Sequence, residues 1–379
     1  MVQSWTRRLF SLAVCVLPLA LPAQGQESGY YQLRDWGGPN GGSMNISSFV
    51  FRDMNDSGTY DLGDRVFVNV AVELLTPSGG AKTVRTNIGG YANFNTSLAQ
   101  VDADITEAGA HTFRVVPPPG WTVTTGNGEQ TIPMSMLVGA PGDIVADHLP
   151  VPVGLAPVPE IRGRAADGPD TVVASGPDGK TVPALSAEGD WYRLPVTPGD
   201  WTVGAQEVAV GRIPVVLPLE WSDEASLAGE AVTLGFDDLF VGDQLMKVPN
   251  GYGGLHWENW VATHGRFYEG EGYINTMMSG EYIAYTSSGH PTAIAGDDPF
   301  DFVGGYFGVA WSSAEGETLR IRAWRGEALV HDDEFALSAY GPVYFAADYK
   351  SITRLEFSTA HYWQAVADDL RFVTAAPRQ

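Results

Sequence analysis

The chain of 379 residues contains a single cysteine and has few basic side chains. That cysteine, Cys15, lies in an N-terminal segment that we expect to be cleaved, so the mature protein would have no disulfide and no thiolate metal ligand. Lys and Arg number 22 against 45 Asp and Glu, which gives a formal net charge of −23. A surface of this charge repels nucleic acid and anionic lipid, so we expect neither nucleic acid nor a membrane as a partner.

Long apolar runs are also missing after the N-terminus, where no stretch could span a bilayer. At the N-terminus, two arginines precede a short apolar run from Leu9 to Leu21, and the small-x-small sequence Ala23-Gln24-Gly25 follows. These are the parts of a secretory signal. We predict a signal peptide over 1–25, cleaved near Gly25 or alternatively at Ala23. The mature protein is expected to be secreted and extracellular, with the periplasm as the alternative location.

Helical periodicity is absent from nearly the whole chain, whereas turn-forming residues are frequent, with 45 Gly and 25 Pro. Hydrophobic residues make up 44% of the chain and aromatic residues 11%, which is sufficient for buried cores. This composition predicts an all-β protein with many short strands, and the length indicates two or three domains.

One twelve-residue segment, Asp53 to Asp64, has the ligand order of a calcium-binding loop. Oxygen-bearing side chains stand at its positions 1, 3, 5, 9 and 12, and Gly58 at position 6 permits the sharp turn. The flanking segments Ser48–Phe51 and Val66–Leu74 have the pattern of strands, not of the two helices of an EF-hand. An acidic turn without metal is the alternative. The predicted Ca²⁺ ligands are Asp53, Asn55, Ser57, Asp61 and Asp64 through their side chains and Thr59 through its backbone carbonyl.

The unit from 44 to 141, preceded by a lead-in over 26–43, continues this pattern. Thr86–Phe94 predicts a strand pair around a Gly-Gly turn, and His111–Trp121 predicts a strand that ends at a Pro-Pro-Pro-Gly turn. With the loop, this order resembles the calcium-binding B-type domain of serine-aspartate repeat surface proteins. The resemblance implies a calcium-binding β-sandwich. Because Ser replaces the family's Asn or Asp at position 5 of the loop and Asp replaces its Glu at position 12, we expect modest affinity, on the order of 10⁻⁴ M.

A Pro-rich segment over 142–158 is predicted to be an extended, semi-rigid linker that holds its neighbours apart. The next unit, 159–220, contains a strand, a Pro-Gly turn and a return strand over Trp191–Val203. This part resembles the carboxypeptidase regulatory-like, transthyretin-type sandwich, which implies a small β-spacer. We expect Trp191 and Trp201 to be core residues.

The last unit, 228–373, carries four spaced motifs: F-D-D-L at its start, P-N-G-Y-G-G-L-H-W, P-F-D-F, and D-D-L-R-F at its end. It is similar to a jelly-roll-like domain of secreted bacterial proteins, often ones with a PEP-CTERM sorting tail. The resemblance implies a fold like that of carbohydrate-binding modules, without an established activity. The whole chain is therefore predicted to be all-β, with two small Ig-/transthyretin-like β-sandwiches followed by a jelly-roll-like β-sandwich.

Two acidic pairs stand at the ends of this last unit. In a jelly roll the first and last strands usually pair, which would bring the pairs together. Four adjacent carboxylates repel one another unless a cation lies among them or they face water. We expect a second, structural Ca²⁺ site there; the alternative is that the carboxylates point outward and cap turns. The residues concerned are Asp237, Asp238, Asp368 and Asp369.

Three aromatic residues in a Gly-rich span of the last unit, Tyr252, Trp257 and Trp260, are candidates for stacking against sugar rings. The alternative is that the two tryptophans belong to the core, and their spacing does not decide between the two.

No zinc spacing of histidines and no Gly-x-Ser-x-Gly elbow is present in the sequence. We therefore expect a secreted, calcium-stabilised, non-catalytic protein that binds glycans or another surface polymer. The alternatives are a structural protein of a cell envelope or biofilm matrix and a calcium-dependent polysaccharide-degrading enzyme. The sequence leaves the oligomeric state open.

Overall fold

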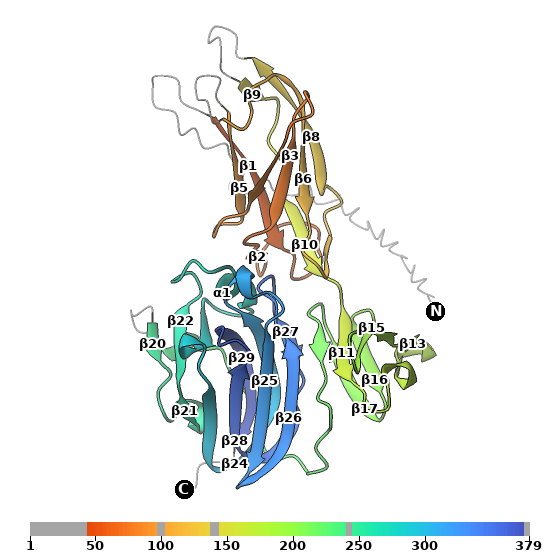
Figure 1. The fold of residues 1–379 in the computed structure, drawn as a ribbon, viewed down its shortest axis with the longest axis vertical. Coiled ribbons are helices and arrows are strands. Elements are labelled where there is room, and N and C mark those ends of the chain that lie inside the picture. Colours follow the sequence, from red (N-terminus) through yellow and green to blue (C-terminus); the bar gives the residue numbers. More distant parts are fainter. Residues whose placement is uncertain (1–43, 97–102, 137–143, 240–244, 375–379) are drawn as a thin grey trace, which may run out of the picture.

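The computed structural model describes residues 44–96, 103–136, 144–239 and 245–374. The predicted signal peptide over 1–25, with Cys15, and the lead-in over 26–43 lie outside the described residues. The described chain is all-β, as the composition predicts, with one short α-helix, α1 (Glu271–Thr276). The strands form three regions: N-terminal, middle and C-terminal (Figure 1). In the described part of the chain, no helix is both long and apolar enough to cross a membrane.

The N-terminal region is a sandwich of two sheets. One has the strand order β4-β3-β6-β8-β9, and the other has the order β2-β1-β10-β7 with β5 also paired to β1. Alternate side chains of β3, β5 and β6 are buried, which is the period-two pattern of half-buried strands. The strands are β1 (Met44–Arg52), β2 (Arg65–Val66), β3 (Ala71–Leu75), β4 (Ala81–Arg85), β5 (Tyr91–Thr96), β6 (Gly109–Val116), β7 (Trp121–Val123), β8 (Glu129–Met136), β9 (Ile144–Ala146) and β10 (Val153–Pro157).

The segment 142–158 was predicted to be an extended linker, and here the structure differs. The segment contains two strands, β9 and β10, which belong to different sheets of the N-terminal region. Strand β9 pairs with β8, and β10 lies between β1 and β7. Val153 and Leu155 enter the core, and Gly154 permits close approach, since a Cβ there would lie 2.7 Å from Cζ of Phe51. The prolines of this segment lie before β10 and at its last residue. At the ends of a strand, proline is compatible with strand pairing, so the proline content does not exclude a strand here.

The middle region is a smaller sandwich. Its sheets have the orders β13-β12-β16-β17 and β14-β15-β11-β18. Trp201 is fully buried in its core, as expected, whereas Trp191 is half-buried and packs against the core of the C-terminal region. The strands are β11 (Glu160–Arg164), β12 (Val173–Ser175), β13 (Thr181–Pro183), β14 (Leu185–Ser186), β15 (Trp191–Pro195), β16 (Gly199–Val203), β17 (Gln206–Val210) and β18 (Val215–Val216).

The C-terminal region holds the largest core, which is rich in aromatic side chains. Its first and last strands, β19 and β29, pair antiparallel with Leu234 opposite Leu370, as the symmetry of its ends predicts. The long strand β24 pairs with both β28 and β29 through several bulges. The strands are β19 (Val232–Leu234), β20 (Leu245–Lys247), β21 (His256–Glu258), β22 (Trp260–His264), β23 (Tyr282–Thr286), β24 (Thr292–Val309), β25 (Thr318–Arg325), β26 (Ala328–Ala336), β27 (Val343–Phe345), β28 (Tyr349–Thr359) and β29 (Ala365–Thr374).

Besides the covalent chain, strand pairing joins the middle region to the C-terminal region. Strand β18 pairs in parallel with β11 on one side and with β27 on the other, so one sheet continues from the middle region into the C-terminal region. The N-terminal region meets the C-terminal region near β2 and α1 (Figure 1). The predicted calcium loop lies at this junction, because it connects β1 to β2.

Candidate functional site

The loop from Asp53 to Asp64 leaves the end of β1 and returns to the start of β2. Three of its residues have left-handed backbone conformations: Asp56 (φ 58°), Gly58 (φ 71°) and Gly63 (φ 102°). Glycine adopts this conformation without steric cost, and aspartate tolerates it better than most residues. The sequence therefore coils tightly enough for alternate side chains to point into the loop.

The first and last residues of the loop are fixed by backbone N–H groups. Asp53 is fully buried, and its two carboxylate oxygens accept hydrogen bonds from the N–H groups of Ser57 (3.0 Å) and Gly58 (2.9 Å). Asp64 accepts from Met54 N–H (2.9 Å) and from Asp61 N–H (2.9 Å). Both carboxylates are thus held toward the interior of the loop.

The remaining predicted ligands lie within hydrogen-bond distance of one another. Asn55 donates from Nδ2 to Asp61 Oδ1 at 3.0 Å. Ser57 Oγ lies 2.9 Å from both Asp61 Oδ2 and the carbonyl oxygen of Thr59. All six residues predicted from the spacing are therefore gathered in one loop, and all six can offer oxygen.

The donor set fits a calcium ion better than other metals. In the described part of the chain, no three His, Cys, Asp or Glu side chains are grouped closely enough to hold a metal by themselves. The loop's candidate site depends instead on three carboxylates combined with an amide, a hydroxyl and a carbonyl oxygen. Ca²⁺ takes six to eight such hard oxygen ligands, whereas zinc prefers nitrogen and sulfur.

The electrostatics of the loop also favour a cation. Partial burial raises the pKa of Asp64, and the negative charges of Asp61 and Asp53 raise it further, against the lowering effect of its two backbone donors. Without a positive charge, the loop therefore holds carboxylates that oppose one another's ionisation.

Arg52, which directly precedes the loop, connects it to the C-terminal region. Its side chain is buried, and its guanidinium donates to the carbonyl oxygens at the end of α1, those of Ile274 (3.3 Å), Asn275 and Met277 (2.9 Å). Burial lowers the pKa of Arg52 to about 9, with a smaller contribution from Arg65, while the charge of Asp368 raises it. A cation at the C-terminal end of a helix is electrostatically favourable.

Further contacts attach the loop and its flanks to both other regions. Arg65, just after the loop, donates to the carbonyl oxygen of Gly280 at 2.7 Å. The side chain of Asn275 bonds to both the N–H and the carbonyl of Val68, at 3.1 and 3.0 Å. On the other side, Asp56 forms an ion pair with Arg212 of the middle region. Sequence reasoning missed these contacts, because nothing local to Arg52 or Asn275 indicates a partner more than 200 positions away.

The acidic residues at the ends of the C-terminal region are satisfied by protein donors. Asp368 is fully buried and accepts from the N–H groups of Met278 (2.7 Å), Ser279 (3.2 Å) and Asp369 (2.8 Å). The hydroxyl of Ser279 donates to Asp369 at 2.6 Å. Burial, and then the neighbouring charge of Asp369, raise the pKa of Asp368 to about 8.

The other acidic pair has donors as well. Asp237 accepts from the N–H of Glu281 (2.8 Å), and Asp238 accepts from the hydroxyl of Tyr252 (2.8 Å). Protein groups, most of them in the segment 278–281 and one in Tyr252, therefore donate hydrogen bonds to all four carboxylates, and the second calcium site stays a prediction.

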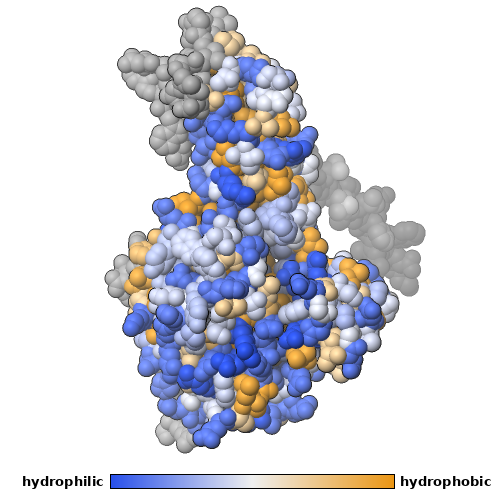
Figure 2. Space-filling model, viewed as in Figure 1, coloured by the Kyte–Doolittle hydropathy of each residue, from blue (hydrophilic) through white to orange (hydrophobic). Residues whose placement is uncertain are grey.

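The three aromatic residues predicted to bind sugar do not form a surface. Trp257 and Trp260 are 6% and 2% exposed, and both belong to the core of the C-terminal region. Tyr252 is half-buried against the same core, with its hydroxyl bound to Asp238. The outer face of this region in Figure 2 is mostly hydrophilic. The prediction of a stacking platform at these residues was wrong, because Trp257 packs edge to face against Trp260, Phe236 and Phe372, and Tyr252 packs tilted against Trp257.

Comparison with known proteins identifies no family. No family model matches the chain, and a search of curated proteins gave no match. One similar solved structure is the Bacillus anthracis TIE protein, with 11% identity, a TM-score of 0.21, and coverage of 45% of this chain and 28% of that one. Another contains the M60 catalytic domain with the CBM51-1 and CBM51-2 domains of Clostridium perfringens ZmpB, with 12% identity, a TM-score of 0.20, and coverage of 82% and 31%. The chain spans less than a third of either protein, and likeness at this level assigns no function.

Proposed function

We propose that this protein is a secreted, calcium-stabilised, non-catalytic protein that binds a glycan or another surface polymer. The observation that carries the calcium part is the gathering of six oxygen-bearing residues in the loop from Asp53 to Asp64, in the order that calcium loops use. The resemblance of this unit to B-type domains of surface proteins supports the same conclusion. An extracellular location fits this role, because calcium there is abundant enough to fill a site of modest affinity.

The position of the loop gives the ion a structural role. The residues just before and after it, Arg52 and Arg65, contact the C-terminal region, and Asp56 within it contacts the middle region. An ion that fixes the loop would therefore also fix the arrangement of the three regions. A stable arrangement would hold a binding surface in one orientation toward an extended polymer.

Calorimetric titration of calcium chloride into the whole mature chain tests the calcium part. We expect one site with a dissociation constant on the order of 10⁻⁴ M, and weaker binding of magnesium, which demands a near-ideal octahedron. Asp61→Asn should weaken calcium binding at least tenfold, whereas Asp56→Asn, in the same loop but outside the ligand positions, should not. Absence of binding, or equal affinity of the Asp61→Asn variant, would contradict the proposal.

A structural role in an envelope or matrix is the second candidate. The sheet that continues through β11, β18 and β27 favours it, because a continuous sheet resists bending between the regions. Affinity electrophoresis through gels that contain soluble polysaccharides separates the two candidates. Retardation by a polysaccharide supports the binding function, and unchanged mobility in all gels favours the structural one.

A further inference from the structure

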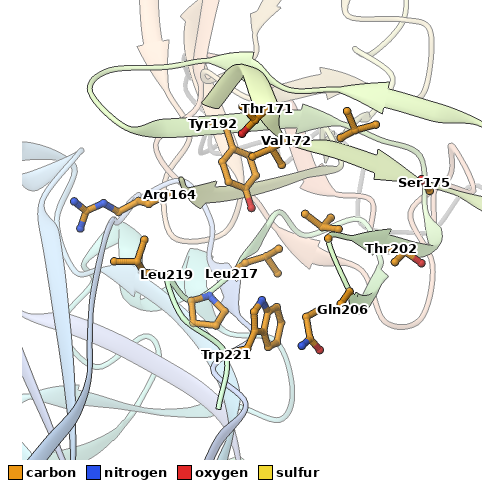
Figure 3. A pocket seen from close by; sticks show the side chains of 15 residues that line it. Arg164, Thr171, Val172, Ser175, Tyr192, Thr202, Gln206, Leu217, Leu219 and Trp221 are labelled. Carbon is orange, nitrogen blue, oxygen red and sulfur yellow. The ribbon is translucent and has the colours of Figure 1, made fainter. Parts of the chain in front are cut away.

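A pocket of about 450 Å³ opens in the middle region, between the strands of its sandwich and the segment 217–221 that leads to the C-terminal region (Figure 3). The volume lies in the range of small-molecule sites. Sequence analysis did not single out this region for binding, since its resemblance implies a spacer.

One hydroxyl in the pocket has no partner. Tyr192 is 5% exposed, and among the described residues its hydroxyl makes no hydrogen bond. Figure 3 shows this hydroxyl directed into the pocket. Burial raises the pKa of Tyr192 to about 12, so the group remains a neutral donor under ordinary conditions. Because no described protein group occupies this hydroxyl, it is available to exchange a hydrogen bond with a ligand in the pocket.

The opposite wall combines an aromatic face with a planar amide. Trp221 lies half-buried against the core, with Leu217 beside it, and Gln206 contributes its side-chain amide (Figure 3). Thr202 adds a further hydroxyl to the lining. The pocket therefore offers a flat apolar surface on one part of its wall and several neutral donors and acceptors on the rest.

The pocket has no free charge. Among its lining residues only Arg164 is charged, and its guanidinium is held by Asp190 (2.8 Å) and Glu334 (3.6 Å). An anionic ligand would find no available cation there, and it would also meet a protein of net charge −23. A wholly apolar ligand would leave the Tyr192 hydroxyl unpaired, which sites of this kind penalise.

We propose that this pocket binds a neutral saccharide unit. A pyranose ring presents an apolar C–H face, which suits the indole of Trp221, and an edge of hydroxyl groups, which suits Tyr192, Gln206 and Thr202. The inference rests on the proposed polymer-binding function and assigns it to the middle region, in place of the aromatic residues of the C-terminal core.

The test is calorimetric titration of the whole mature chain with cellohexaose, maltohexaose, xylohexaose and chitohexaose. At least one of these should bind. Tyr192→Phe removes only the hydroxyl and should weaken binding roughly two- to tenfold, the loss of one hydrogen bond. Trp221→Ala should weaken binding about tenfold or more. The control is Trp363→Ala, which removes a partly exposed tryptophan of the C-terminal region that does not line the pocket, and it should leave binding unchanged.

The outcomes separate this inference from the function on which it rests. If Trp221→Ala fails to fold, Tyr192→Phe and Gln206→Ala decide, because neither removes core packing. Binding that survives all three changes overturns the pocket while the polymer-binding function stands. Binding lost in Trp363→Ala alone moves the site to the C-terminal region and likewise overturns the pocket. A chain that binds none of the four oligosaccharides also overturns the saccharide assignment, whereas the polysaccharide gels still test the general function.

Discussion

The loop from Asp53 to Asp64 and the acidic ends of the C-terminal region both contain clustered carboxylates, but the groups that contact these carboxylates differ. In the loop, Asp61 is contacted by Asn55 and Ser57, side chains that can turn an oxygen toward an ion. At the ends, Asp368 is contacted by backbone N–H groups, which cannot act as ligands. Asp53 and Asp64 of the loop also accept from backbone N–H groups, and Asp53 is as fully buried as Asp368, so these two features do not separate the two places. The difference lies in the middle of the loop, where Asn55, Ser57 and Asp61 are exposed. We therefore propose a calcium site for the loop, where carboxylates alternate with other oxygen-bearing side chains that an ion can reach.

Arg52 directly precedes the loop and interacts electrostatically with Asp368 at the acidic ends. Replacing Arg52 is therefore expected to have the largest effect on stability. Arg52→Met keeps much of the apolar side chain but leaves three carbonyl oxygens at the end of α1 without their buried, positively charged donor. We expect a loss of about 3 kcal/mol in the free energy of unfolding, the cost of breaking a buried charged interaction. Urea unfolding of the whole chain in a calcium chelator measures it.

Arg65→Met is the matched control, since Arg65 flanks the other end of the loop and donates to a single carbonyl near the surface. Its loss should stay below about 1 kcal/mol. Equal losses in the two variants would show that Arg52 does not hold the junction together.

The buried carboxyl at the C-terminal ends should make stability depend on pH. Because its folded-state pKa, about 8, is raised above the value of 3.8 in the unfolded chain, Asp368 contributes stability that is complete below about pH 4. This contribution is lost as the pH rises through about 8. The unfolding free energy should therefore fall by roughly 2 kcal/mol between pH 6 and 8.

Asp368→Asn, which cannot ionise, is the reference for this measurement. Thermal unfolding of both proteins in chelator over pH 6 to 9 should show the fall in the wild type alone. Parallel curves for the two proteins would mean that Asp368 is ionised throughout, with its three N–H donors outweighing its burial.

A smaller effect is expected at Asp369. Asp369→Asn weakens the hydrogen bond from the Ser279 hydroxyl and should cost about 1 kcal/mol. The cost should be the same in calcium and in chelator, because protein donors satisfy the acidic ends. A cost that appears only in calcium would show that these ends also hold an ion, and the contrast with the loop would disappear.

Local patterns allowed much of the fold to be predicted. Alternating residues such as Val72 and Leu74 identified strands, and the candidate calcium loop could be proposed because its predicted ligands lie within twelve residues. The pairing of β19 with β29 followed from the matched ends of the last unit. Each of these features depends on spacing along the chain.

Features that depend on distant partners could not be predicted. The proline content suggested a linker, but Val153–Pro157 forms a central strand. Its partners lie in β1 and β7, which the local sequence does not reveal. The burial of Trp257 depends on rings of other strands. The contacts of Arg52 and the pocket at Tyr192 likewise arise only when separate segments meet.

The central claim is that calcium stabilises the whole chain through one loop. Thermal unfolding of the mature protein, of Asp61→Asn and of Asp56→Asn, each in excess calcium and in chelator, tests it most directly. At calcium about 100 times the dissociation constant, the wild type and Asp56→Asn should each gain about 2.7 kcal/mol, and Asp61→Asn should gain almost nothing. Identical unfolding of the wild type in the two buffers, or an undiminished gain in Asp61→Asn, would contradict the account.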